Sequence, residues 1–315
     1  MGVRSIRTIG KKEKEKPKSK MYTDAELSDN ISAVTAETVN VVASREKQVV
    51  LYPRASSLYD SCMRMHVLCS KLKRTRIQWI SVQLGVTFEI GNAVHHSLQN
   101  NPAILGNSRI GFWKCLACQA LSEFGRFPVI ECLCGADLTA YQYDEFSLKM
   151  DDPVCVTGHP DMFLDKGNGN IRVIEFKTMK KSEYVGLAYP LIKHIWQIML
   201  YMRLCNRCVN PTPLKIDETM GYIMYVCKEH TRNDVLPYKV FPVRFDRDTF
   251  KLVLDKLLTY RKGIKPFPMA MPEVHEECQS SSGLNFSCWR YKDCPVKTEC
   301  AHLLKPEGFK TYVNI

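Results

Sequence analysis

Three charged residues, Asp161, Glu175 and Lys177, lie in the stretch GHPDMFLDKGNGNIRVIEFKT, residues 158 to 178. MFLD and IRVIEFKT flank a Gly/Asn turn, which predicts a hairpin centred on Asn168. Asp161 then faces Glu175, because both are equally distant from Asn168, and opposed residues bring their Cβ atoms to about 5 Å. Two carboxylates that close repel each other unless a cation lies between them. The pattern therefore predicts a divalent-metal site.

Lys177 shares a strand face with Glu175, because side chains alternate along a strand. A lone E-x-K is more often a solvated face on which the two charges balance. This strand is instead apolar on both faces, which is typical of a covered central strand. Its apolar residues are Ile171, Val173, Ile174 and Phe176. Charges at the end of such a strand favour a metal-holding site over surface decoration.

Two closely spaced cysteine pairs, Cys115 with Cys118 and Cys132 with Cys134, suggest a second kind of metal site. Thiolates on two tight turns supply four tetrahedral ligands to zinc. The alternative is four unrelated core cysteines, and the second pair is C-x-C instead of the commoner C-x-x-C. We expect a zinc ribbon at residues 111–140, folded locally as an insertion.

The C-terminal part of the chain contains another cysteine group. Its members are Cys278, Cys288, Cys294 and Cys300. Iron–sulfur clusters use four thiolates, often with one from a distant segment. A second zinc site is the alternative, since both metals accept four cysteines. Cys205 and Cys208 also form C-x-x-C, but no second pair is evident and we interpret them as structural.

Hydrophobic periodicity predicts the elements that must position these residues. One expected helix is capped by Ser56 or Ser57 and carries Cys62. Further helices are expected at 88–99, 190–205 and 250–264. Strands are expected between 141 and 178, at 221–227 and at 238–245. We predict one α/β domain over residues 49–315, with a mixed central sheet flanked by helices.

The chain has 315 residues, 45% of them hydrophobic, so it can bury a sizeable core. Its net charge of +11 indicates a polyanionic partner, and nucleic acid is the leading candidate. Much of the excess lies in residues 1–48, which we expect to be a disordered basic tail and linker that binds nucleic acid or only solubilises the chain.

Fourteen cysteines without an apolar signal core predict a reducing, intracellular setting, in which thiols bind metals and do not form disulfides. No run approaches the roughly 18 to 20 apolar residues of a membrane helix. We expect a cytoplasmic protein that does not contact a membrane.

G-H-P-D followed by E-F-K resembles the signature of the PD-(D/E)XK nuclease superfamily, specifically its RecB-like branch with the CRISPR-associated RecB-like exonucleases. G-N-A-V-H at 91–95 is similar to the G-x-x-x-H helix of that branch, and Q-I-M-L-Y at 197–201 to its Q-x-x-x-Y helix. The motifs follow the family order across roughly residues 51 to 300. The resemblance implies a restriction-endonuclease-like fold.

The same resemblance implies a role for each matching residue. Mg²⁺ or Mn²⁺ would be bound by His95, Asp161, Glu175 and the backbone carbonyl of Phe176. Lys177 would position or activate the attacking water, and Gln197 with Tyr201 would line the site. By chemistry alone His96 is as suitable as His95, and Gln197 and Tyr201 could equally be the polar edge of a core helix.

Many RecB-like nucleases hold a [4Fe-4S] cluster through one early cysteine and three late ones, which implies Cys62, Cys278, Cys288 and Cys294 here. Cys300 is the alternate, because the usual C-x-x-C before the final spacing is absent. The iron–sulfur segment would cover 275–304.

These observations predict a metal-dependent DNA exonuclease that acts on single-stranded or frayed ends, with a helicase or a recombination or replication partner supplied in trans. The alternative is a catalytically inactive nucleic-acid-binding module, stabilised by zinc and iron–sulfur sites.

Overall fold

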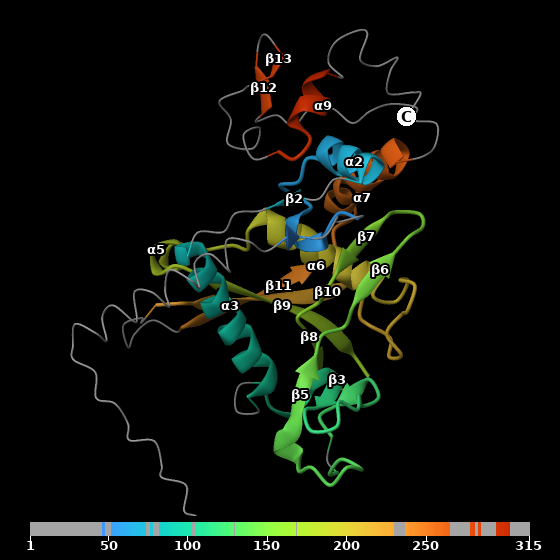
Figure 1. Cartoon of the computed structure of the whole chain (residues 1–315). Coiled ribbons are helices and arrows are strands. Elements are labelled where there is room, and N and C mark those ends of the chain that lie inside the picture. The colour runs from blue at the N-terminus through green and yellow to red at the C-terminus, as the bar shows by residue number, and fades with distance from the viewer. Residues whose placement is uncertain are drawn as a thin grey trace, which may run out of the picture.

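The computed structural model describes residues 46–47, 52–73, 76–77, 82–101, 105–128, 130–167, 169–229, 237–264, 278–280, 283–284 and 294–302 (Figure 1). Within these residues a seven-stranded sheet has the order β11-β10-β9-β8-β3-β4, and β5 pairs with β3. Its strands are β3 (Arg109–Cys115), β4 (Gly125–Arg126), β5 (Tyr141–Asp144), β8 (Met162–Asp165), β9 (Ile171–Met179), β10 (Met220–Cys227) and β11 (Tyr238–Arg244). β9 and β10 are parallel and the other pairs are antiparallel, so the predicted mixed sheet is confirmed.

Strand β9 occupies a central place between β8 and β10, and most of its side chains are buried. Its β-branched and aromatic residues suit a strand covered on both faces. The β8–β9 register pairs Met162 with Ile174 and Asp165 with Ile171, which is symmetric about position 168. The predicted hairpin is therefore confirmed, and one further step of this register sets Asp161 opposite Glu175.

Helices cover both faces of the sheet. On one face α3 (Val82–Asn100) packs through Leu98 against Ile174 and Phe176 of β9. The other face packs against α6 (Ile192–Leu204), with α7 (Arg247–Ile264) and α2 (Met63–Leu72) beyond it. In the view of Figure 1, α6, α7 and α2 lie above β9 and β10, and α3 runs obliquely from beside α5 toward β5. The expected helices at 88–99, 190–205 and 250–264 correspond to α3, α6 and α7.

The short elements complete the described chain. They are β1 (Glu46–Lys47), η1 (Ala55–Ser57), β2 (Arg76–Ile77), η2 (Gly106–Ser108), η3 (Leu138–Ala140), β6 (Leu148–Met150), β7 (Val156–Gly158), α5 (Lys181–Val185), β12 (Gln279–Ser280), β13 (Gly283–Leu284) and α9 (Lys297–His302). The expected tail, residues 1–48, lies outside the described residues except for β1. In the part of the chain that is described, no helix combines the length and apolarity needed to cross a bilayer.

The prediction that Cys62 lies within a helix is wrong. Residues 55–57 form only a 3-10 turn, and α2 begins at Met63. Cys62 is the N-cap, with extended backbone angles, and its Sγ accepts a hydrogen bond from the N–H of Met65 at 3.4 Å. A thiol that accepts at the cap satisfies one of the free N–H groups of the first turn. The Cys62 side chain therefore lies at the helix end.

Candidate active site and metal centres

The two predicted acidic residues are both buried and close to other predicted site residues. Asp161 is 6% exposed and Glu175 is 2% exposed. Asp161 Oδ2 accepts a hydrogen bond from the N–H of Phe176 at 2.6 Å. Glu175 Oε1 accepts from Lys177 Nζ at 2.7 Å and from Gln197 Nε2 at 2.6 Å. Residues from β9, α6 and the segment before β8 therefore meet at one point.

The second carboxylate oxygen of Glu175, Oε2, is buried without a hydrogen-bond partner among the described residues. A buried polar atom that lacks a partner costs free energy. Burial, and then the charge of Asp161, raise the pKa of Glu175 to about 8. A divalent cation between the two carboxylates would provide a partner for Oε2 and remove the repulsion. Carboxylate oxygens and an imidazole are ligand types that a divalent cation takes, but among the described residues His95, Asp161 and Glu175 are not a group whose ligand atoms all lie within 4.8 Å of one another.

Lys177 remains a cation in this setting. Burial by itself would lower its pKa, but the charges of Glu175 and Asp161 outweigh burial and the pKa is raised. Its ammonium group therefore acts as a fixed positive charge and hydrogen-bond donor beside the acidic pair.

Helix α6 presents Gln197 and Tyr201 to the site from neighbouring turns. Gln197 Nε2 donates to the Tyr201 hydroxyl at 3.1 Å, and both side chains are buried. Gly158 makes this approach possible, because a Cβ there would lie 2.7 Å from Tyr201 Cε1 and 3.1 Å from the Cβ of Ala55. The glycine of the G-H-P-D motif is thus required for packing against Tyr201.

The structure distinguishes His95 from its neighbour. His95 Nδ1 lies 3.3 Å from Asp161 Oδ1, and its ring packs edge-on against Phe176 with centroids 5.9 Å apart. His96 is exposed on α3. Contact with the acidic residues therefore favours His95, while its role as a ligand stays a prediction.

All six predicted catalytic side chains line one cavity of about 540 Å³. Sequence reasoning did not identify the rest of its wall, which includes Arg54, Ser56, Ser147, Lys149, Thr157 and His159. These residues lie in or beside the short elements η1, β6 and β7. His159 belongs to the G-H-P-D motif, and Lys149 is the exposed position of β6, in which its two neighbours are buried. Arg54 and Lys149 add positive charge beside the acidic pair.

A polar network behind Asp161 was also missed. Gln99 Nε2 donates to the backbone oxygen of Asp161 at 2.9 Å and to Glu145 Oε1 at 2.8 Å. Arg109, buried over Trp113, donates to the backbone oxygen of Gln99 at 2.7 Å. Because β3 carries Arg109, this network links the strand that leads to the cysteine cluster with the candidate active site.

The four central cysteines form a group whose Sγ atoms all lie within 4.8 Å of one another. The Cys115–Cys134 distance is 3.8 Å and the Cys118–Cys132 distance is 3.5 Å. Zinc–sulfur bonds of about 2.3 Å give a tetrahedral edge of roughly 3.8 Å, so the spacing fits one zinc ion. The segment is joined to the sheet, because β3 both pairs with β8 and ends at Cys115.

Helix α9 brings late cysteines toward α2. Cys294 and Cys300 pack against a small core of Leu68, Cys69 and Val296. Burial raises the pKa of the Cys300 thiol, the Arg64 side chain beside it opposes the rise, and the nearby Cys62 adds to it. Cys300 therefore lies near Cys62, whereas Cys288 lies outside the described residues.

No protein-family model and no curated protein sequence matches this chain. Among solved structures, the chain is similar to SSO0001, with 14% identity and a TM-score of 0.36 over 89% of this chain and 97% of that chain. It is also similar to LHK-Exo, an alkaline exonuclease from Laribacter hongkongensis, with 12% identity and a TM-score of 0.38 over 68% of this chain and 87% of that chain. The complex of LHK-Exo with dAMP gives 12% identity and a TM-score of 0.39, covering 69% and 89% of the two chains. Likenesses this distant assign no chemistry.

Proposed function

We propose that this chain is a Mg²⁺- or Mn²⁺-dependent deoxyribonuclease of the RecB-like PD-(D/E)XK type, which digests DNA from single-stranded or frayed ends. The observation that carries the proposal is the buried Oε2 of Glu175, which has no hydrogen-bond partner among the residues that the structure describes. One register step beyond the Met162–Ile174 pair sets Glu175 opposite Asp161, and its other oxygen, Oε1, accepts from Lys177 in a cavity with a partly basic wall. A module that only binds nucleic acid has no use for two buried acidic residues, since they repel phosphates.

The residues present can be given roles around the bound cation. His95, Asp161, Glu175 and the backbone carbonyl of Phe176 would hold it. When bound, a divalent cation polarises a phosphoryl oxygen and lowers the pKa of water. Lys177 places an ammonium group where the phosphate gains negative charge during attack.

Residues around this set would orient it and hold the substrate. Gln197 fixes Glu175 through its 2.6 Å hydrogen bond, and Tyr201 supports Gln197 in turn. The side chains of Arg54 and Lys149 would bind flanking phosphates in the cavity.

A digestion assay tests the enzyme proposal. Single- and double-stranded DNA, labelled at the 5′ or the 3′ end, is incubated with Mg²⁺ or Mn²⁺ and with the wild type, Asp161→Ala or Asp165→Ala. Asp165 is the matched control, because it lies at the far end of β8 and pairs with Arg126. We expect digestion by the wild type and Asp165→Ala only. Equal digestion by all three proteins, or by none, would reject the proposal. DNA binding without digestion by the wild type would indicate a binding module.

We further propose that Cys115, Cys118, Cys132 and Cys134 bind zinc, and that Cys62, Cys278, Cys288 and Cys294 bind a [4Fe-4S] cluster. Cys300 is the alternate ligand, and its packing with Cys294 against the same small core at α2 supports that alternative. Anaerobically purified protein should absorb broadly at about 400 nm, as thiolate-ligated iron and sulfide do. Cys278→Ser and Cys300→Ser are measured in parallel. The variant that loses this absorption identifies the fourth ligand. A colourless protein with two zinc ions would contradict the cluster.

A further inference from the structure

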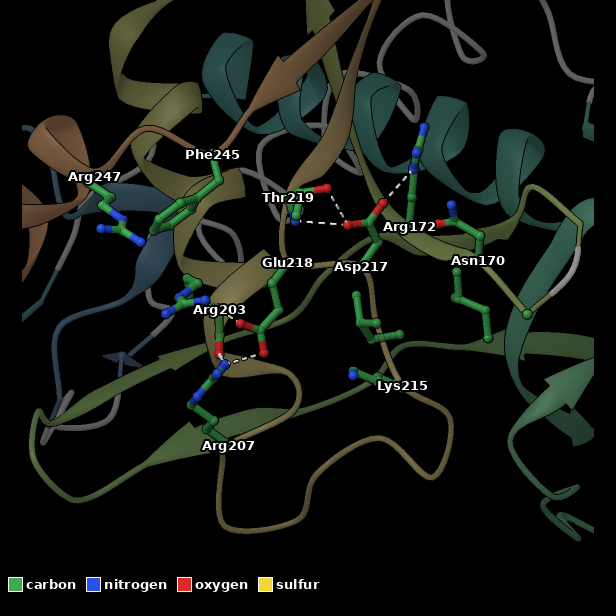
Figure 2. Close-up of a pocket in the computed structure, with 13 residues that line it drawn as sticks. Asn170, Arg172, Arg203, Arg207, Lys215, Asp217, Glu218, Thr219, Phe245 and Arg247 are labelled. Atoms are coloured by element: carbon green, nitrogen blue, oxygen red, sulfur yellow. Dashed lines mark hydrogen bonds and ion pairs between the residues drawn. The ribbon is translucent and has the colours of Figure 1, made fainter.

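A second cavity, of about 890 Å³, is larger than the candidate active site and rich in basic residues (Figure 2). It lies where β9 begins, where α6 ends, and along residues 215–219. Its charged residues are Arg172, Arg203, Arg207, Lys215, Arg247, Asp217 and Glu218. The cavity thus contains three more cations than carboxylates.

The two acidic residues already have cationic partners. Glu218 contacts both Arg203 and Arg207, and Asp217 Oδ2 accepts from Arg172 Nε at 2.9 Å. Figure 2 shows the Glu218 group on the left and the Asp217–Arg172 pair at the upper right, with Lys215 below Asp217 in this view. The acidic residues therefore hold the arginines in place and leave the excess charge uncompensated.

The remaining cations are available to a ligand. Within the part of the chain that the structure describes, Lys215 and Arg247 form no ion pair, and both are exposed. Arg203 stacks over the Phe245 ring at 4.9 Å, which fixes the plane of its guanidinium group. Oriented guanidinium groups bind phosphate oxygens through paired hydrogen bonds, and lysine adds a point charge. Phosphate is the ligand chemistry that this arrangement suits.

The position of the cavity indicates where that phosphate comes from. Helix α6 places Gln197 in the candidate active site and Arg203 in this cavity. The two residues are six positions apart, which is about 9 Å along the helix axis and roughly 120° around it. The axial part of this separation corresponds to roughly three base steps at about 3.4 Å each, and the strand must also pass around the helix from one site to the other. One nucleic-acid strand is long enough to reach both sites.

We propose that this cavity binds a backbone phosphate of the nucleic-acid strand whose scissile bond occupies the candidate active site. The inference rests on the proposed nuclease function. It assigns to Lys215 and Arg247 the task of holding the strand a few nucleotides from the reaction.

Binding measurements on full-length protein test this assignment. Asp161→Ala serves as the parent, so that the strand is not cut, and a labelled single strand is titrated at several salt concentrations. Lys215→Glu/Arg247→Glu should weaken binding by about tenfold or more, and Lys215→Gln/Arg247→Gln should reduce the salt slope by about 1.4, the value for two phosphate contacts to a single strand. The matched control is Lys251→Glu/Lys262→Glu, which changes the charge equally at exposed positions of α7 outside the cavity.

Each outcome decides the matter. Weaker binding in the cavity variants alone supports the assignment. Equal weakening in the control pair, or no weakening in either, overturns it in favour of diffuse charge attraction. If the parent binds no DNA at all, the proposed function fails first and the inference fails with it. Titration with dAMP and with inorganic phosphate separates the sources: a loss of their binding in the cavity variants, with unchanged strand binding, would assign the cavity to free phosphates and overturn the strand as its source.

Discussion

The cysteine cluster and the acidic site are both candidate metal centres, but they are assembled differently. The cluster takes its four ligands from residues 115–134, where two tight turns set the spacing. The acidic site combines His95 of α3, Asp161 before β8 and Glu175 of β9. Lys177 and Gln197 both donate hydrogen bonds to the Glu175 carboxylate. A centre built from local turns stabilises its own segment, whereas a centre built from distant elements depends on the whole core and retains repulsion that a ligand can relieve.

The largest expected effect is the loss of DNA digestion when the acidic site is changed. Glu175→Gln preserves shape but removes the charge, so digestion should fall by about 10³-fold. The free energy of unfolding without metal should stay constant or rise, since a buried repulsive charge is gone. Cleavage rates and denaturant titrations measure the two effects. Glu183→Gln, on the exposed face of α5, is the control. A large loss of stability in Glu175→Gln would show that the acidic pair is structural.

Substitution of a cysteine in the cluster should, by contrast, lower the free energy of unfolding. Cys132→Ser removes one thiolate, so metal content should fall by one zinc per chain and the free energy of unfolding by about 3 kcal/mol or more, because structural zinc binding is folding free energy. Elemental analysis and thermal melts with and without a chelator check this. The chelator should lower the Tm of the wild type but not that of the variant. If Cys132→Ser kept both its zinc and its Tm, the four cysteines would not form a structural metal site.

The sequence predicted the parts of both centres that depend on short-range pattern. The turn between β8 and β9 set the register of Asp161 and Glu175, and the cysteine spacing set the cluster. It did not reveal the hydrogen bonds of Gln99 to Glu145 and to Asp161, because those partners lie 46 and 62 positions away with no periodic signal. The basic cavity was missed for the same reason, since its arginines come from separate elements.

Glycine substitutions sharpen the distinction between a residue required for packing and one that only matches a motif. Gly158→Ala should lower the free energy of unfolding by about 2 kcal/mol and reduce digestion, because the new Cβ overlaps Tyr201 and Ala55. Among the described residues, a Cβ at Gly91 in helix α3 would contact only Thr178 Oγ1, at 3.5 Å. Gly91→Ala should raise stability by roughly 0.5 to 1 kcal/mol. Denaturant titration compares the two. If both variants were destabilised equally, the backbone at Gly91 would require a glycine for a reason other than the contacts of a Cβ atom.

The last expected effect is on the pH dependence of stability and concerns His194, which lies near Lys177. Its Nδ1 is 2.8 Å from the Tyr225 hydroxyl, and burial, with the charges of Lys177 and Lys193, lowers its pKa to about 3. The folded state therefore binds fewer protons than the unfolded state between about pH 3 and the ordinary histidine pKa of about 6.5. This contribution to stability is complete above about pH 6.5 and is lost progressively as the pH falls toward 3.

The sign is opposite for Glu175. The pKa of Glu175 is raised to about 8, above the ordinary glutamate value of about 4.3. Between these two values the folded state binds more protons than the unfolded state, so the stability that Glu175 contributes falls as the pH rises. His194→Gln should reduce the stability that is lost between pH 7 and pH 5 by roughly 2 kcal/mol. Glu175→Gln should reduce the stability that is lost between pH 6 and pH 8. Urea titrations of the metal-free proteins across pH 5 to 8 measure both slopes. If His194→Gln instead steepened the stability loss at acid pH, the histidine would be charged in the folded state and would add to the positive charge beside the acidic pair.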